Sequence, residues 1–112
     1  MKIISGILTI DELEKMLAMF GDMVKVVVDI DRELLAIDAE LHSDLEALLL
    51  EDGSKQASLW GINLYPEMPG DEFIEFDSMI NMRPSGGNRS RSVDNEEIRK
   101  KIIAVVTKKV KR

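Results

Sequence analysis

The chain has 112 residues, the usual length of one domain, so we expect residues 1–112 to form a single domain. Its 45% hydrophobic and 32% charged residues are typical of a globular protein. The chain has no Cys, which excludes a disulfide scaffold, thiolate zinc sites and cysteine nucleophiles. No apolar run approaches the roughly 20 residues that span a bilayer, so we expect a cytoplasmic protein with no membrane contact.

Charge is distributed unevenly along the chain. Residues 1–82 carry 5 Lys and Arg against 18 Asp and Glu, whereas residues 83–112 carry 10 against 3, and the net charge is −6. This split is typical of an anion-binding end on an acidic body, or of two parts that attract each other within the fold. The acidic body and the lack of a familiar motif do not favour nucleic acid as a partner.

The first predicted elements are a short strand at 2–8 and a helix at about 10–20. Thr9 followed by Glu12 forms a capping box at the start of that helix. Two further strands, at 23–30 and 33–41, flank Asp31-Arg32, and this spacing predicts a tight hairpin.

The register of this hairpin can be tested against the sequence. A two-residue loop pairs Val28 with Leu35 and gives one wholly apolar face. On the other face it places Lys25 opposite Asp38, which is an opposite-charge cross-strand pair. The pattern therefore predicts a hairpin with one face in the core.

Residues 43–51 fit either a short helix or a strand, and the turn residues that follow favour a strand slightly. Strands at 58–65 and 73–82 pair antiparallel in a register that sets Leu64 against Ile74 and Ile62 against Phe76. Ile74, Phe76, Ile80 and Met82 then share one face of the second strand.

The last third of the chain is a polar loop at 83–93 followed by a helix. Asp94 with Glu97 is expected to cap that helix, which carries an apolar stripe of Ile98, Ile102, Val106 and Val110. The fold class is therefore α+β: an antiparallel β-meander of about four to six strands with an N-terminal and a C-terminal helix packed on one face.

Four segments carry a resemblance to a known family: residues 40–44, 51–56, 59–66 and, above all, 76–91 with the sequence FDSMINMRPSGGNRSR. Together they resemble a family of small uncharacterised microbial proteins catalogued only as a domain of unknown function. The resemblance covers nearly the whole chain and implies a soluble stand-alone protein. It implies no activity, and no catalytic residue is carried over from it.

His42 is the only His, and it lies between Glu40 and Asp44. On a strand the three side chains point the same way and form a candidate metal site, or a carboxylate orients His42 as a general base. The alternative is an exposed His at a turn with acidic neighbours.

A second candidate site lies on the strands at 58–65 and 73–82. In the predicted register Asn63, Glu75, Asp77 and Asn81 line one sheet face beside Tyr65. Glu75 and Asp77 are therefore further catalytic candidates, as a coupled carboxylate pair. The alternative is the solvent-exposed face of an antiparallel sheet.

The loop at 83–93 is the third candidate and the one we weigh most heavily. It combines two Gly residues with three guanidinium groups that suit phosphate or carboxylate, and it leads into a helix start. The candidate ligand-binding residues are Asn81, Arg83, Asn88, Arg89 and Arg91. The alternative is a loop whose Arg side chains pair with the acidic body.

Two functions remain open. The first is a binding module that recognises an anionic ligand or partner through the Arg83–Arg91 loop, with a homodimer expected because the edges of a small sheet need cover. The second is a small metal-dependent or hydrolytic enzyme that uses His42 with Glu40 or Asp44, or Glu75 with Asp77. The sequence identifies no cofactor.

Overall fold

A computed structural model describes residues 1–111 and confirms the α+β class, with three α-helices, a five-stranded antiparallel sheet and a small parallel strand pair. Single turns of 3-10 helix lie at Gln56–Ser58, Gly70–Phe73, Met79–Asn81 and Pro84–Gly86. The other elements, in chain order, are β1 (Lys2–Ile4), β2 (Leu8–Thr9), α1 (Ile10–Phe20), β3 (Val24–Asp29), β4 (Leu34–Ile37), α2 (His42–Glu51), β5 (Leu59–Leu64), β6 (Ile74–Glu75), α3 (Glu96–Lys109) and β7 (Val110–Lys111).

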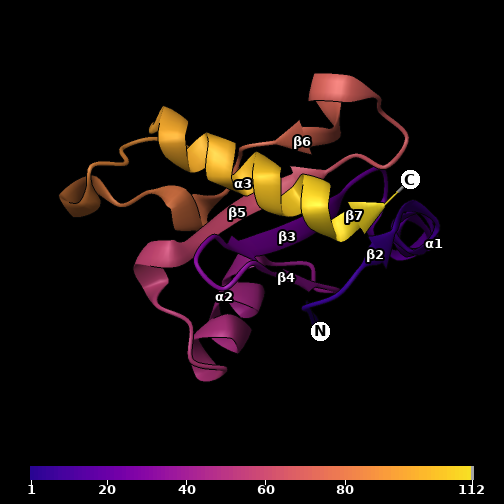
Figure 1. The fold of residues 1–112 in the computed structure, drawn as a ribbon, viewed down its shortest axis with the longest axis horizontal. Coiled ribbons are helices and arrows are strands. Elements are labelled where there is room, and N and C mark those ends of the chain that lie inside the picture. The colour runs from indigo at the N-terminus through magenta and orange to yellow at the C-terminus, as the bar shows by residue number, and fades with distance from the viewer. Residues whose placement is uncertain (112) are drawn as a thin grey trace.

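The strand order of the sheet is β1-β4-β3-β5-β6, so it is not the simple meander predicted. The chain crosses from one side of β3 to the other through α2. Two predicted pairs are confirmed, Val28 with Leu35 and Leu64 with Ile74. The short parallel pair of β2 and β7 joins the two ends of the chain (Figure 1).

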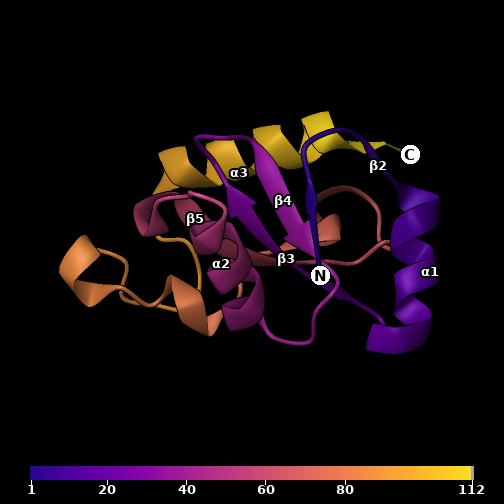
Figure 2. The same cartoon turned by 90° about the horizontal axis from the view of Figure 1, so that it is seen from below.

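The helices cover both faces of the sheet rather than one (Figure 2). Helices α1 and α3 pack with the larger apolar cluster, on the face of Val24, Val26 and Val28. Helix α2 packs on the opposite face, where Leu45 and Leu49 contact the smaller cluster around Val27 and Leu59. None of the helices within residues 1–111 is long and apolar enough to cross a membrane.

The preference for a strand at 43–51 was wrong, because this segment is the helix α2. Leu45 and Leu49 are four residues apart and fully buried, so they form the stripe that holds a helix on a sheet. The helix starts at His42, with Leu41 at the N-cap and no side chain in a capping hydrogen bond.

The hairpin of β3 and β4 closes more loosely than predicted. Its turn spans residues 30–33, and Asp29 Oδ1 accepts the N–H groups of Asp31 and Arg32, each at 2.9 Å. Strand β4 ends at Ile37, and Asp38 has a φ of 73° and pairs with the N-terminal amine at 3.5 Å. The predicted pairing of Lys25 with Asp38 is therefore wrong.

The predicted strand at 73–82 ends after Glu75. Beyond that point the side chain of Asn81, rather than a strand backbone, hydrogen-bonds the edge of β5. Asn81 Oδ1 accepts the N–H of Gly61 at 2.8 Å, and Asn81 Nδ2 donates to the Gly61 carbonyl at 2.9 Å. The predicted shared face is lost, since Phe76 packs on the larger cluster and Ile80 on the smaller one.

The helix ends follow the sequence in most respects. The capping box of α1 is present, with Thr9 Oγ1 accepting from the Glu12 N–H at 3.2 Å. The apolar stripe of α3 packs into the core as predicted. Its cap is Asn95 rather than Asp94, because Asn95 Oδ1 accepts the Ile98 N–H at 3.1 Å.

In the part of the chain that the structure describes, three ion pairs connect the basic part to the acidic part: Arg83 with Glu46, Arg91 with Asp77, and Lys108 with Glu33. Mutual attraction within the fold therefore accounts for part of the uneven charge.

Candidate functional site

A row of three polar residues crosses the sheet on the face that carries α2. Lys25 of β3 lies opposite Asn63 of β5, which lies opposite Glu75 of β6. Alternation along β3 and β5 places this row on the same face as Val27 and Leu59, which α2 covers. These three residues lie on the part of that face beyond the start of α2. There, polar side chains cover the sheet only in part.

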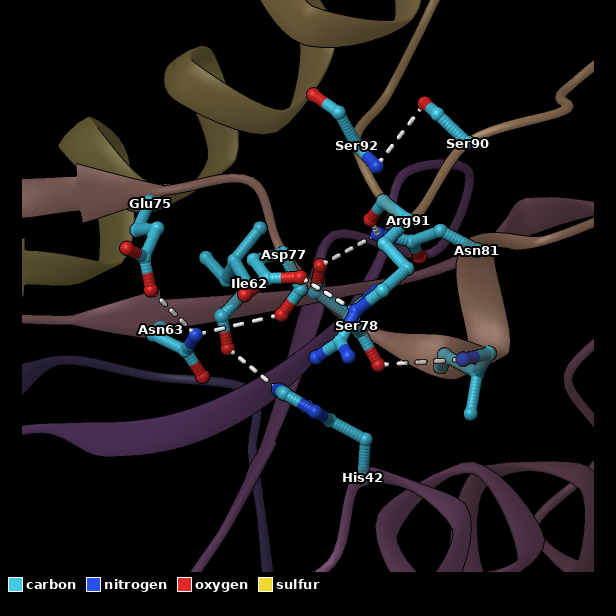
Figure 3. A network of polar contacts seen from close by, with 12 residues as sticks. His42, Ile62, Asn63, Glu75, Asp77, Ser78, Asn81, Ser90, Arg91 and Ser92 are labelled. Atoms are coloured by element: carbon cyan, nitrogen blue, oxygen red, sulfur yellow. Dashed lines mark hydrogen bonds and ion pairs between the residues drawn. The ribbon is translucent and has the colours of Figure 1, made fainter.

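Asn63 is at the centre of the row and is only 3% exposed. Its Nδ2 donates to Glu75 Oε1 at 2.8 Å and to the Asp77 carbonyl at 3.3 Å (Figure 3). The Tyr65 hydroxyl also donates to Glu75 Oε1, at 3.1 Å. The pKa of Tyr65 is raised, mainly by burial and to a smaller extent by this hydrogen bond. Asn63 Oδ1 is buried and accepts no hydrogen bond from any described residue, which is costly unless a ligand or water supplies a donor.

His42, the first residue of α2, points toward the carbonyl of Ile62, next to Asn63 (Figure 3). Its Nε2 lies 2.7 Å from the Ile62 carbonyl oxygen, and because a carbonyl only accepts, Nε2 must carry the proton. Burial lowers the pKa of His42 and so favours the neutral ring. Nδ1 therefore keeps its lone pair, and no group within residues 1–111 donates to it.

The start of α2 lacks a capping side chain. Its N-cap is Leu41, a residue that cannot cap and whose side chain is 54% exposed. Within residues 1–111 no acceptor is bonded to the N–H groups of His42 and Ser43. These groups, together with the helix dipole, give the start of α2 a partial positive charge.

Arg91 and Asp77 form the opposite wall. Arg91 Nε lies 2.7 Å from Asp77 Oδ1, and the Arg91 carbonyl accepts the Ser78 N–H at 3.0 Å. The polar loop at 83–93 is thereby held against the segment that follows β6. Both side chains of this ion pair are about half exposed, so solvent reaches them.

These groups surround one open hollow of about 560 Å³, which we call the polar groove. It brings together members of all three sites that the sequence proposed: His42 of the first, Asn63, Glu75 and Asp77 of the second, and Arg91 of the third. Its full lining is Met23, Lys25, Leu41, His42, Ser43, Asn63, Tyr65, Glu75, Asp77, Ser78, Met79, Ile80 and Arg91.

Three of the proposed ligand-binding residues are instead held by bonds inside the chain. Asn81 bonds the backbone of β5, and Asn88 Nδ2 donates to the carbonyls of Asn81, Ser90 and Ser92. The Arg83 guanidinium lies 4.6 Å from the centre of the Trp60 ring, donates to the carbonyls of Leu59 and Ile80, and lies 3.8 Å from Glu46.

Arg89 is exposed and lies outside the groove. The Asp94 carboxylate accepts the Ser90 hydroxyl at 2.6 Å and the Arg89 N–H at 3.0 Å, and these bonds lower the pKa of Asp94. The carboxylate thus uses the donors of the loop just before α3, so an anion has no obvious place there.

The proposed metal ligands Glu40, His42 and Asp44 do not lie on a strand, so the geometry expected for them was wrong. His42 is buried, whereas Glu40 and Asp44 are exposed on either side of the helix start. Within residues 1–111 no three His, Asp or Glu side chains lie close enough together to hold a metal ion.

A larger hollow of about 640 Å³ lies between α3 and β6, but its walls are mainly apolar. Its one cationic lining residue, Arg99, stacks on Phe76 at 4.7 Å and donates to the Val93 carbonyl and the Ser92 hydroxyl. Polar groups converge at the polar groove, which is therefore the better candidate.

The groove residues that the sequence did not identify include Lys25, Leu41 and Ser43. Lys25 was assigned to a pair with Asp38, and in the structure it forms no ion pair within residues 1–111. Leu41 and Ser43 were not proposed because a strand was slightly preferred over a helix at 43–51. A Leu at a helix start without a capping residue is a departure from local preference, and such departures are expected at functional sites.

The fold and the groove define a small α+β domain with one open polar hollow beside a helix start. The chain belongs to the family described as "Protein of unknown function (DUF5674)", which matches it over residues 2–109. This confirms the resemblance found in the sequence. No curated protein and no solved structure matches the chain.

Proposed function

We propose that the chain is a binding module for a small anionic ligand, and that the anion binds in the polar groove between Lys25 and the start of α2. The observation that carries the proposal is the uncapped start of α2: among the described residues, its first two N–H groups have no acceptor and the ammonium group of Lys25, which lines the same groove, has no ion pair. Backbone N–H donors and a nearby ammonium group are the usual partners of a carboxylate or phosphate.

The charges of the groove support this position for the anion. The negative charge of Asp77 is compensated by Arg91 at 2.7 Å. Among the described residues, Glu75 accepts hydrogen bonds from the neutral groups of Asn63 and Tyr65 and has no cationic partner. The negative charge of Glu75 lies on the β6 side of the groove, and Lys25 and the helix start lie on the other side. An anion is therefore favoured at the α2 side and disfavoured beside β6.

Of the three Arg residues in the loop at 83–93, Arg91 is the one that lines this groove. The proposal therefore assigns anion binding by the Arg83–Arg91 loop to Arg91 alone. Arg91 supports the anion from the opposite wall, at the expense of part of its contact with Asp77. The buried Asn63 Oδ1 accepts a hydrogen bond from a ligand hydroxyl or from an ordered water.

The test is a thermal-shift titration with phosphate and acetate at constant ionic strength. We expect saturable stabilisation of the unmodified chain, and its loss in Lys25→Met. Lys101→Met removes the same charge from the exposed face of α3 and should leave the effect intact. Equal behaviour of the two variants, or no stabilisation by either anion, would contradict the proposal.

Arg91→Ala and Arg89→Ala form a second matched pair in the same loop. We expect Arg91→Ala to weaken anion binding several-fold and Arg89→Ala to leave it unchanged, because only Arg91 lines the groove. A larger loss of anion affinity in Arg89→Ala than in Arg91→Ala would indicate that the anion binds at the exposed part of the loop instead.

An enzyme is a second candidate, and the state of His42 favours it. The Ile62 carbonyl fixes the tautomer, and the lone pair of Nδ1 remains available to take a proton from a bound molecule. His42→Gln keeps an N–H donor for Ile62 and removes the base. Turnover of a chromogenic ester or phosphate that His42→Gln abolishes, with anion binding unchanged, would support this role. Equal turnover in both proteins would exclude His42 as a base for that probe.

A further inference from the structure

An apolar hollow of about 390 Å³ adjoins the polar groove. The two hollows share Met23, Lys25 and Leu41, so Lys25 stands at the boundary between them. The apolar hollow is formed where the end of α1, the start of β3 and the segment before α2 meet, and its lining is Met19, Phe20, Met23, Lys25, Ala39, Glu40 and Leu41.

The apolar side chains around these two hollows are unusually open to solvent. Met19 is 74% exposed, Leu41 is 54% exposed, and Met79 on the rim of the polar groove is 63% exposed. Phe20 and Met23 are half-buried and belong to neither apolar cluster of the fold. Exposed apolar side chains that gather at one place mark a binding surface, and the flexible Met thioether adapts to the shape of a bound chain.

The charges beside the apolar hollow favour an anion at one end of it. Lys25 is half-buried at the boundary and has no ion pair with any described residue, whereas Glu40 is exposed, so solvent screens the charge of Glu40. The free N–H groups of His42 and Ser43 lie on the same side of the boundary as the polar groove.

Little strand edge is open to an extended peptide at this surface. Strand β3 is paired with β5 over Val24–Asp29 and with β4 over Val27–Asp29, which leaves at most the β4-side edge of Val24–Val26 for an added strand. We therefore expect recognition here to depend mainly on one anionic point and on apolar contact beyond it.

We propose that the ligand is an aliphatic carboxylate, with its head between Lys25 and the start of α2 and its hydrocarbon tail in the apolar hollow. This inference rests on the proposed anion site, because the head occupies the same place. It adds the ligand class: an anionic head on an apolar chain, in place of a small hydrophilic anion.

The test is an NMR titration with acetate, butanoate, hexanoate and octanoate, following the amide signals of His42 and Ser43. We expect saturable shifts with each acid and an affinity that rises by about fourfold for each added methylene until the tail fills the hollow. An affinity that stays flat along the series would overturn the inference and leave the anion site intact. No saturable shift with any member, together with no effect of phosphate, would instead overturn the anion site itself.

Two exposed Met residues provide matched variants for the tail. Met19→Ser removes a wall of the apolar hollow, and Met68→Ser changes a Met that lines neither hollow. We expect Met19→Ser to weaken octanoate binding at least fivefold and to leave acetate binding unchanged, with no effect of Met68→Ser. Equal octanoate affinities in the two variants would overturn the assignment of the tail.

An anionic head on an apolar chain also occurs in a lipid bilayer, so a vesicle measurement separates the two sources. We expect the protein to sediment with phosphatidylglycerol vesicles no more than with phosphatidylcholine vesicles. Sedimentation specific to phosphatidylglycerol, without saturable octanoate binding, would assign the surface to a membrane and overturn the inference.

Discussion

The side-chain amide of Asn81 hydrogen-bonds both backbone groups of Gly61, at 2.8 and 2.9 Å, and so replaces part of a strand at the edge of β5. A Cβ on residue 61 would lie 2.5 Å from the Ser78 Cβ, so the close approach of the two segments requires Gly there. This contact stops β6 after Glu75 and turns the chain so that Asp77 and Arg91 reach the polar groove.

Asn81→Ala is expected to lower the free energy of unfolding by about 2–4 kcal/mol, because it leaves a buried N–H and a buried carbonyl of β5 unpaired. Urea denaturation measures this. Asn95→Ala removes the exposed helix cap of α3 and serves as the control, at about 1 kcal/mol. Equal losses in the two variants would show that the Asn81 contacts contribute little.

Arg83→Ala is expected to destabilise the fold by about 2–4 kcal/mol, since Glu46 would keep a buried carboxylate oxygen without its cation. Arg83→Lys should recover less than half of this, because an ammonium group lacks the planar fork that stacks on Trp60. Chemical denaturation of both variants measures this. Arg89→Ala is the control, and its free energy of unfolding is expected to lie within about 0.5 kcal/mol of that of the unmodified chain. Full rescue by Lys would mean that charge alone matters.

The pKa of His42 is lowered by burial, so the unfolded chain binds a proton more readily than the folded one. Stability is therefore expected to be complete above the ordinary His pKa of 6.5 and to fall as the pH drops from there through the lower folded pKa. His42→Gln should abolish this slope between about pH 6.5 and 5. The measurement is the urea midpoint as a function of pH, and an unchanged slope in His42→Gln would contradict the assignment.

Leu41→Ser is expected to stabilise the chain by about 0.5–1 kcal/mol, because a hydroxyl supplies the missing cap of α2. The same hydroxyl would use an N–H group that we assign to the anion, so phosphate affinity should fall several-fold. Thermal denaturation with and without phosphate measures both effects. Stabilisation with undiminished phosphate affinity would show that the helix start does not bind the anion.

Much of the fold was predictable because local and long-range signals agreed. The capping box at Thr9 fixed the start of α1, and the Val pattern of β3 fixed its register with β4. The segment of helix α2 fitted a helix or a strand, and the strand was slightly preferred because the apolar stripe, Leu45 and Leu49, is short and turn residues follow it. The end of β6 was missed because a single distant amide, Asn81, determines it.

The candidate site was predictable only in part, for a related reason. The sequence identified His42, Glu75, Asp77 and Arg91 by their chemistry, but as members of three different sites. Their convergence depends on the crossing of β5 to the far side of β3 and on the turn made by Asn81, which no local pattern records. Lys25 drew no attention because its partner on the predicted hairpin was an acid.

The most direct test of the anion site is the response of two backbone amides to phosphate. In a ¹⁵N–¹H NMR titration at constant ionic strength, the signals of His42 and Ser43 are expected to shift saturably in the unmodified chain and to stay in place in Lys25→Met. Shifts that fail to saturate, or that fall on the Lys residues of α3 instead of the start of α2, would contradict the account.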